Sequence, residues 1–163
     1  MISDQEFLYG AAFSRLVHYG GQISLTHLSE VHPAIYLVET NSSKSAILFK
    51  LSKKPKSAWS FTLSNQEQLA IATVSEKYLH TKIFFSLICH KDGICCISKD
   101  RLYDLLDLSE DVSAQHISVS RKLHGSYHVS GPGRQQMNRS IPQNDWPYII
   151  LQNGDNSHES ISY

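Results

Sequence analysis

The chain has 163 residues, of which 41% are apolar and 18% are charged, and its formal net charge at pH 7 is zero. This size and composition are typical of one folded domain with a substantial core, and they exclude a disordered chain. No stretch approaches the roughly 18 uninterrupted apolar residues that a membrane-spanning helix needs. The acidic start MISDQEF lacks the basic segment of a secretory signal. Three cysteines without such a signal favour free thiols in a reducing compartment, so we expect a cytoplasmic protein.

The charge is unevenly distributed along the chain. Residues 1–43 carry a net charge of −3, residues 44–101 carry +6, and residues 102–163 carry −3. A polarised distribution can attract an anionic partner even when the total charge is zero. We therefore expect the segment 44–101 to contribute a binding surface.

The N-terminal part of the chain predicts a helix followed by three strands. Ser3 and Glu6 have the spacing of a capping box, and the pair Gly20-Gly21 is suited to end the helix that they begin. Short apolar stretches separated by turn residues then predict three strands, at residues 22–28, 34–39 and 45–52.

A basic and aromatic stretch at residues 53–63 precedes a second capping box, formed by Ser64 and Glu67. This box predicts a helix that extends to about residue 79. The strongest signal for a buried strand in the chain is KIFFSLICH at residues 82–90, and a tight turn connects it to a strand at residues 94–98. Leucines at helical spacing predict a short helix at residues 99–107.

The C-terminal part predicts two further strands, at residues 116–121 and 126–130, and an apolar segment at residues 146–151 that packs against the domain. We expect residues 1–151 to form a single α/β domain and residues 152–163 to form a frayed tail. Strands occur in runs and do not alternate strictly with helices. This order predicts an α/β (α+β) fold in which a mixed β-sheet is flanked by helices.

An acidic residue, a lysine and a second acidic residue stand out in this order of elements. Glu39 ends the second predicted strand, Lys50 lies in the third, and Glu67 lies in the capped helix that follows. Over about residues 4–90 this arrangement resembles the restriction-endonuclease-like, PD-(D/E)xK superfamily, whose core order is αβββαβ. In that family a carboxylate at the end of the second strand and another carboxylate two residues before a lysine hold Mg²⁺. The lysine orients or activates the attacking water.

The position two residues before Lys50 is Leu48, so the second carboxylate of the motif is missing there. Some family members carry it on the following helix, where Glu67 stands, and some add outer-shell support from the first helix, where Glu6 stands. The resemblance implies Lys50, Glu39 and Glu67 as catalytic residues, with Glu39 and Glu67 as Mg²⁺ ligands. It implies a nucleic-acid-binding protein, and a nuclease in defence or DNA maintenance where the site is active.

Each of these three residues also has an ordinary structural interpretation. Lys50 shares its strand face with Ala46 and Leu48, and a lysine there is typical of an edge strand protected against sheet pairing. Glu39 has the position of a solvated strand end. Glu67 is fully explained by its capping box.

The basic stretch has two interpretations as well. In the first, Lys53, Lys54 and Lys56 contact nucleic-acid phosphates while Trp59 stacks on a base. In the second, the lysines form a solvated turn, and Trp59 and Phe61 alternate into the core.

Two other functions compete with binding of DNA or RNA. The chain fits a non-enzymatic protein-interaction or immunity-type module, in which the basic loop docks on an acidic protein partner or the chain forms a homodimer. A small-molecule enzyme would instead use His124 and His128 on the last two predicted strands, in a deep pocket. The spacing of these histidines suits a shared metal only on a helix, which the sequence does not predict there.

Overall fold

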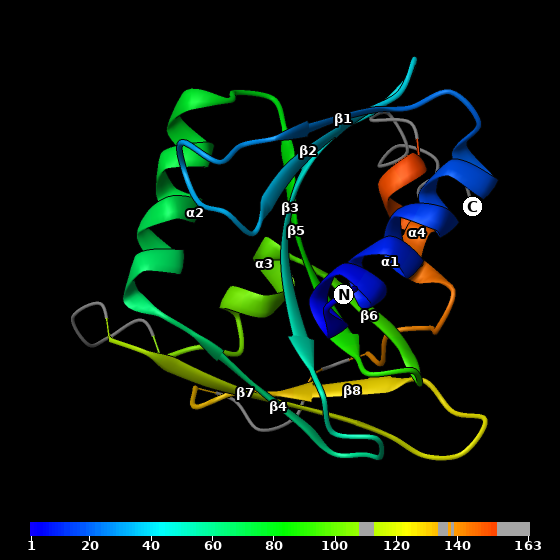
Figure 1. Cartoon of the computed structure of the whole chain (residues 1–163). Coiled ribbons are helices and arrows are strands. Elements are labelled where there is room, and N and C mark those ends of the chain that lie inside the picture. The colour runs from blue at the N-terminus through cyan, green and yellow to red at the C-terminus, as the bar shows by residue number, and fades with distance from the viewer. Residues whose placement is uncertain (108–112, 134–136, 138, 153–163) are drawn as a thin grey trace, which may run out of the picture.

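The structure is a computed structural model that describes residues 1–107, 113–133, 137 and 139–152. Within these residues the chain forms four helices and eight strands, arranged as two β-sheets (Figure 1). The helices are α1 (Asp4–Gly20), α2 (Asn65–Lys77), α3 (Lys99–Tyr103) and α4 (Asp145–Leu151). None of the described helices is long and apolar enough to cross a membrane. Apart from Gln152, the predicted tail 152–163 lies outside the described residues.

The larger sheet has five strands in the order β1-β2-β3-β5-β6. The strands are β1 (Ser24–His27), β2 (Ile35–Glu39), β3 (Lys44–Ser52), β5 (Lys82–Cys89) and β6 (Gly93–Ser98). β3 and β5 are parallel, and every other neighbouring pair in this sheet is antiparallel. The parallel pair requires a crossover between its two strands, and α2 lies in that crossover.

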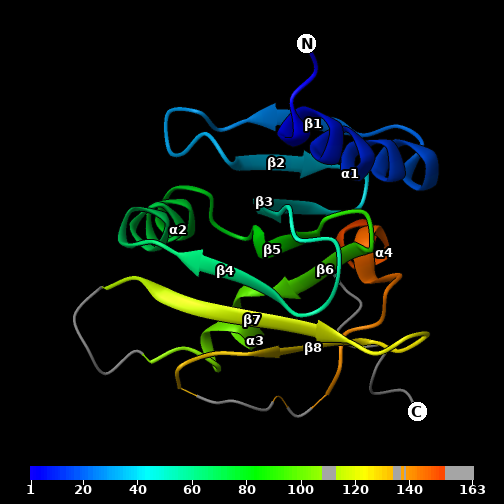
Figure 2. The same cartoon turned by 60° about the horizontal axis from the view of Figure 1, so that its bottom comes forward.

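The smaller sheet has three antiparallel strands in the order β4-β7-β8. They are β4 (Trp59–Leu63), β7 (Gln115–Arg121) and β8 (Tyr127–Ser130). This sheet crosses the carboxyl ends of β3 and β5, at the bottom of Figure 1 and the front of Figure 2. β4 thus belongs in sequence to the connection between β3 and β5, but it pairs in the smaller sheet.

The larger sheet is buried on both faces, which explains the continuous apolar runs of its central strands. On one face, α1 and α4 cover side chains such as Ile47 and Phe49. On the other face, α2 and the smaller sheet cover side chains such as Ala46 and Leu48. Both helices with a predicted capping box begin where the sequence indicates, because Ser3 with Glu6 and Ser64 with Glu67 make both reciprocal hydrogen bonds.

The mixed α+β architecture is confirmed, and the structure differs from the prediction in three details. The strands form two sheets where one mixed sheet was expected. The stretch WSFTL, at residues 59–63, was not predicted as a strand although its burial alternates strictly along the chain. The predicted helix at 99–107 ends earlier, at Tyr103.

Candidate functional site

Lys50 and Glu67 form a close ion pair between β3 and the first turn of α2. The Lys50 ammonium donates to both carboxylate oxygens of Glu67, with Nζ–Oε1 and Nζ–Oε2 distances of 2.8 and 2.6 Å. The side chains are only 17% and 10% exposed. Glu67 at the same time accepts the backbone N–H of Ser64 at 2.8 Å. Glu67 therefore has two roles, capping α2 and neutralising a half-buried lysine.

The electrostatics of this pair favour the charged form of Glu67. Burial alone would raise the pKa of its carboxyl, but the hydrogen bonds from Lys50 and Ser64 and the charge of Lys50 outweigh burial and lower it. β3 lies between β2 and β5, so the interpretation of Lys50 as an edge-strand residue is wrong. A lysine on a central strand is tolerated because its charge is paired.

Glu39 lies far from this pair. It ends β2 opposite Lys44, at the beginning of β3, whereas Lys50 is near the end of β3. Six residues of strand separate Lys44 from Lys50, which corresponds to about 20 Å. The structure therefore brings Lys50 and Glu67 together and does not bring Glu39 to them.

These residues do not fit a Mg²⁺ site of the expected kind. A metal held by Glu39 and Glu67 needs both carboxylates in one coordination sphere, and the strand register separates them. The Glu67 oxygens are already engaged by Lys50 and Ser64. Glu6 lies on α1, which packs on the opposite face of the sheet, and its carboxylate accepts the Ser3 N–H. No group of three or more potential His, Cys, Asp or Glu ligands converges within the described residues.

The loop between β3 and β4, residues 53–58, is exposed throughout. Lys53, Lys54 and Lys56 all lie on it, and the Lys53 side chain is 71% exposed. Trp59, which directly follows the loop, is only 1% exposed. Its indole N–H donates to the Lys54 carbonyl at 2.8 Å, and its ring packs edge-on against Tyr127. Trp59 cannot stack on a base in this arrangement, so the predicted role of its ring is corrected to that of a core residue that anchors the loop.

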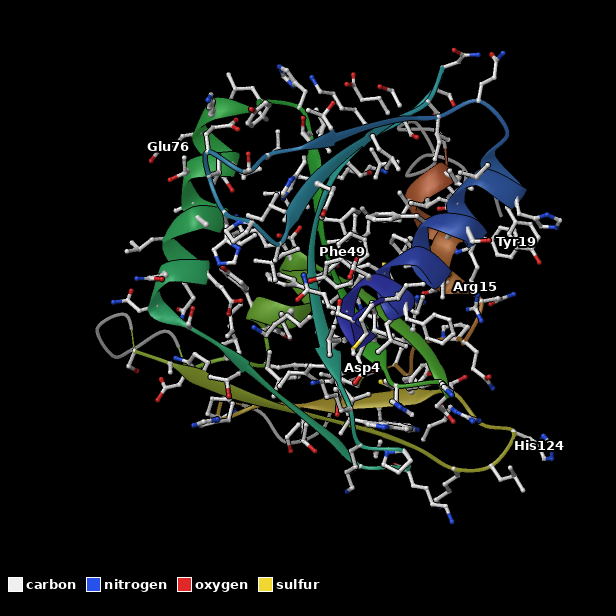
Figure 3. The ribbon with its side chains drawn as sticks, in the orientation of Figure 1. Asp4, Arg15, Tyr19, Phe49, Glu76 and His124 are labelled. Atoms are coloured by element: carbon white, nitrogen blue, oxygen red, sulfur yellow. The ribbon has the colours of Figure 1, made fainter. Side chains whose placement is uncertain are left out.

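Two further turns lie beside this loop and add lysines to it. The β5–β6 turn contributes Lys91, and the β7–β8 hairpin contributes Lys122; both residues are exposed. Both turns emerge at the end of the molecule where β3 and β5 finish, and His124 marks the projecting hairpin in Figure 3. We call the surface formed by Lys53, Lys54, Lys56, Lys91 and Lys122 the basic end. In open α/β sheets, ligands characteristically bind beyond the carboxyl ends of parallel strands.

A half-buried polar network joins these turns to one another. Arg121 donates to both oxygens of Asp92, with Nε–Oδ2 and Nη2–Oδ1 distances of 2.9 and 2.6 Å. The Tyr127 hydroxyl donates to Asp92 at 2.9 Å. The backbone N–H of Arg121 donates to the Ser57 hydroxyl at 3.1 Å. One arginine thereby connects the loop 53–58, the β5–β6 turn and the β7–β8 hairpin.

The network also sets the ionisation of its members. The hydrogen bond from Arg121 holds the pKa of the Asp92 carboxyl below its usual range, while burial raises the pKa of the Tyr127 hydroxyl. Gly93 follows Asp92 with φ at +155°, and a Cβ there would lie 2.5 Å from the Tyr127 hydroxyl oxygen. Only glycine allows the β5–β6 turn to approach the smaller sheet so closely.

The remaining lysines of the segment 44–101 lie at the opposite end of the larger sheet. We call the surface formed by Lys44, Lys77, Lys82 and Lys99 the opposite end. Lys77 lies 4.0 Å from Glu30, Lys99 donates to the Ser75 hydroxyl at 3.1 Å, and Lys44 pairs in register with Glu39. The segment with the high positive charge is therefore divided between two ends of the molecule and does not form one surface.

Sequence reasoning grouped Lys122 with the histidines of the last two strands and not with the basic loop, and it missed the network around Asp92. Lys122 belongs to the segment 102–163, whose net charge is negative, and this concealed its contribution to a basic surface. The turn-forming Gly125 and the flanking strands nevertheless indicate a hairpin there. Nothing in one sequence pairs Asp92 with Arg121, which is 29 residues away.

His124 and His128 do not form a shared metal group. His124 lies at the exposed hairpin tip with φ at +64°, and His128 lies on the exposed face of β8. Comparison of the chain with protein-family models, with curated proteins and with solved structures finds no match. The geometry of the basic end and of the Lys50–Glu67 pair is therefore the basis on which a function is assigned.

Proposed function

We propose that this protein binds nucleic acid through the basic end. The observation that carries the proposal is the convergence of five exposed lysines from three separate loops, residues 53–58, the β5–β6 turn and the β7–β8 hairpin. Clustered lysines on one surface are the electrostatic footprint of a phosphate-binding protein. The acidic residues nearby reduce this charge little, because Asp92 is neutralised by Arg121 and Asp4 lies 3.8 Å from Lys53 in an exposed pair.

The organisation of the loops supports binding of a partner of fixed geometry. The hydrogen bonds of Arg121 to Ser57 and Asp92 hold all three loops to one another. A surface whose charges are positioned before binding loses less conformational entropy when the partner arrives. The lysines therefore form a pre-organised surface and not a set of independent flexible contacts.

The resemblance to the restriction-endonuclease-like core enters the proposal as a fold relationship. Its support is the sequence α1, then the antiparallel meander β1-β2-β3, then α2, then β5 parallel to β3. β4, inserted between β3 and α2, departs from that order. The proposal is limited to binding, because Lys50 is neutralised by Glu67 and because Glu39 lies at the other end of its strand.

Measurement of affinity across salt concentrations tests the proposal. Fluorescence anisotropy with labelled single-stranded DNA, duplex DNA and RNA should give a log Kd that rises with log salt in proportion to the phosphates contacted. Each lysine that contacts a phosphate in a duplex should contribute about 0.9 to this slope. Replacement of Lys53, Lys54, Lys56 and Lys91 by Gln should therefore lower the slope by as much as about 3 to 4.

The opposite end supplies the matched control. Replacement of Lys44, Lys77, Lys82 and Lys99 by Gln removes the same formal charge from the protein and should leave most of the slope intact. Equal losses in the two variants would show a non-specific effect of net charge and would contradict the proposal. Absence of binding to all three nucleic acids at low salt would also contradict it, and would favour an acidic protein partner for the same surface.

Cleavage is tested separately from binding. Incubation of the labelled strands with Mg²⁺ or Mn²⁺ should leave them intact if the protein only binds. Cleavage that is lost in Glu67→Gln would show that the protein has a catalytic site that depends on this residue, and the restriction of the proposal to binding would then be wrong.

A further inference from the structure

A groove with an apolar floor lies between α1 and the hairpin of β5 and β6. Its volume is about 680 Å³, which lies within the range of small-molecule sites. Leu8, Ile88 and Ile94 contribute its buried apolar surface. Phe7 and Ile2 border it while remaining 61% and 74% exposed, so two large apolar side chains face solvent beside an apolar cavity. We call this cavity the α1–β6 groove.

The helix that forms one wall of the groove carries a glycine at its middle. Gly10 lies on α1, and beyond its own chain neighbours and the helix backbone no atom lies within 4 Å of the position that a Cβ would occupy. Glycine inside a helix is less favourable than alanine, and packing within the described chain does not require it here. Gly10 and Ala11 together leave the backbone of α1 open along the groove, so that an occupant can approach this backbone closely.

Positively charged side chains outnumber negatively charged ones on the rim of the groove. Arg15 on α1 and Lys91 in the β5–β6 turn both border it, and His90 lies beside Lys91. Arg15 projects away from the sheet in Figure 3. Neither Arg15 nor Lys91 makes a hydrogen bond or ion pair to another side chain among the described residues. Glu6 also borders the groove, and its carboxylate, which accepts the Ser3 N–H within the capping box, sets one negative charge against the two positive charges of Arg15 and Lys91.

We propose that the α1–β6 groove binds an amphipathic monocarboxylate, a molecule with an apolar chain and one carboxylate. The apolar chain lies over Leu8, Ile88 and Ile94, where it displaces water from apolar surface. The carboxylate lies against Arg15 and Lys91, which supply charge-assisted hydrogen bonds. A neutral molecule of the same shape would fill the groove and leave both cations without a partner.

Decanoate and 1-decanol provide a matched pair of probes, because they share the chain length and differ in charge. Titration calorimetry with the full chain, below the micelle-forming concentration, should detect saturable binding of decanoate and much weaker binding of decanol. The variant Arg15→Gln removes one of the two cations and should weaken binding of decanoate about tenfold or more. Equal affinities for the acid and the alcohol would overturn the assignment of a carboxylate site.

A filled groove supplies the second test. Ala11→Trp places a large side chain in the groove at an exposed position of α1, and it should abolish decanoate binding. Ala72→Trp, at an exposed position of α2, is the matched control and should bind decanoate normally. Circular dichroism and thermal unfolding establish that both variants fold. Unchanged affinity in Ala11→Trp, or no saturable binding by the native chain, would overturn the proposal.

The two proposed surfaces meet at Lys91, which belongs to the basic end and also borders the groove. Where nucleic acid binds as proposed above, decanoate should lower its affinity, and nucleic acid should lower the affinity of decanoate by the same factor. The two proposals remain separable. Ala11→Trp should retain nucleic-acid binding, and replacement of Lys53, Lys54 and Lys56 by Gln should retain decanoate binding.

Discussion

The two ends of the larger sheet carry similar numbers of lysines but arrange them differently. At the opposite end, Lys77 and Lys99 have partners on neighbouring elements, and Lys44 faces Glu39. At the basic end, Lys53 and Lys54 also have contacts, with the Asp4 carboxylate at 3.8 Å and the Ala58 carbonyl at 2.7 Å. What differs is that the hydrogen bonds of Arg121 join the loops that carry these lysines to one another. Charge alone therefore does not distinguish a binding surface from an ordinary solvated one. The hydrogen bonds that connect the lysine-bearing loops of the basic end make the distinction.

The largest expected effect comes from the ion pair that joins β3 to the start of α2, near the basic end. Lys50→Met should destabilise the protein by about 3–5 kcal/mol, because it leaves the Glu67 carboxylate buried without its cation. Urea unfolding measures the change. The double variant Lys50→Met/Glu67→Gln should recover part of the loss, because glutamine retains the capping function without the charge. A loss below about 1 kcal/mol in the single variant would show that the pair behaves as a surface contact.

The next effect concerns the network that joins the three loops. Asp92→Asn should cost about 1–3 kcal/mol, because Arg121 and Tyr127 lose a charged acceptor. Tyr127→Phe, which removes one hydrogen bond and keeps the ring, should cost about 1 kcal/mol. Thermal unfolding of the two variants beside the native chain measures both. If Asp92→Asn is no less stable than the native protein, the network does not hold the basic end together.

The same carboxylates predict a dependence of stability on pH. The pKa values of Glu67 and Asp92 in the folded protein lie below their ordinary values of 4.5 and 3.8. Their contribution is therefore present at neutral pH and is lost as the pH falls below those ordinary values toward the lowered folded values. Denaturant unfolding from pH 7 down to about pH 3 should show this decline. The double variant Asp92→Asn/Glu67→Gln should show a flatter profile, and an identical profile would contradict the assignment.

The smallest effect is expected at the opposite end. Lys77→Gln removes an exposed ion pair, whose side chains are 55% and 57% exposed, and should change stability by less than about 0.5 kcal/mol. The change in urea midpoint measures this directly. A loss as large as that of Asp92→Asn would remove the contrast between the two ends.

Local sequence signals predicted the elements well and their assembly poorly. The capping residues Ser3 and Ser64 correctly indicated where two helices begin, because a capping box involves residues only three apart. Apolar alternation likewise indicated which side chains of β3 lie on the same face. The pairing of β4 with β7 joins residues that are more than 50 positions apart, such as Leu63 and Gln115. Periodicity identifies the buried face of a strand without identifying the strand's neighbour.

At the candidate site, too, some contacts could be predicted from the sequence and others depended on how the strands assemble. The family resemblance implied that Lys50 and Glu67 share one site, and the structure places their side chains in contact. The position of Glu39 depended on strand register, which placed it opposite Lys44. Trp59 was ambiguous because a basic flank and an alternating strand occur in the same short stretch, and burial decides between them.

The departure of β4 from the crossover has a consequence for the order in which the chain folds. During synthesis of the chain, the residues of β4 are added well before those of its partner β7, which begins at Gln115. A nascent chain therefore exposes the alternating apolar residues of WSFTL, with an unpaired backbone edge, until more than fifty further residues have been added. The lysines that immediately precede this strand are residues that discourage association of such an edge with other chains. The loop that contributes three lysines to the basic end would then also protect the unfinished protein before it has any partner to bind.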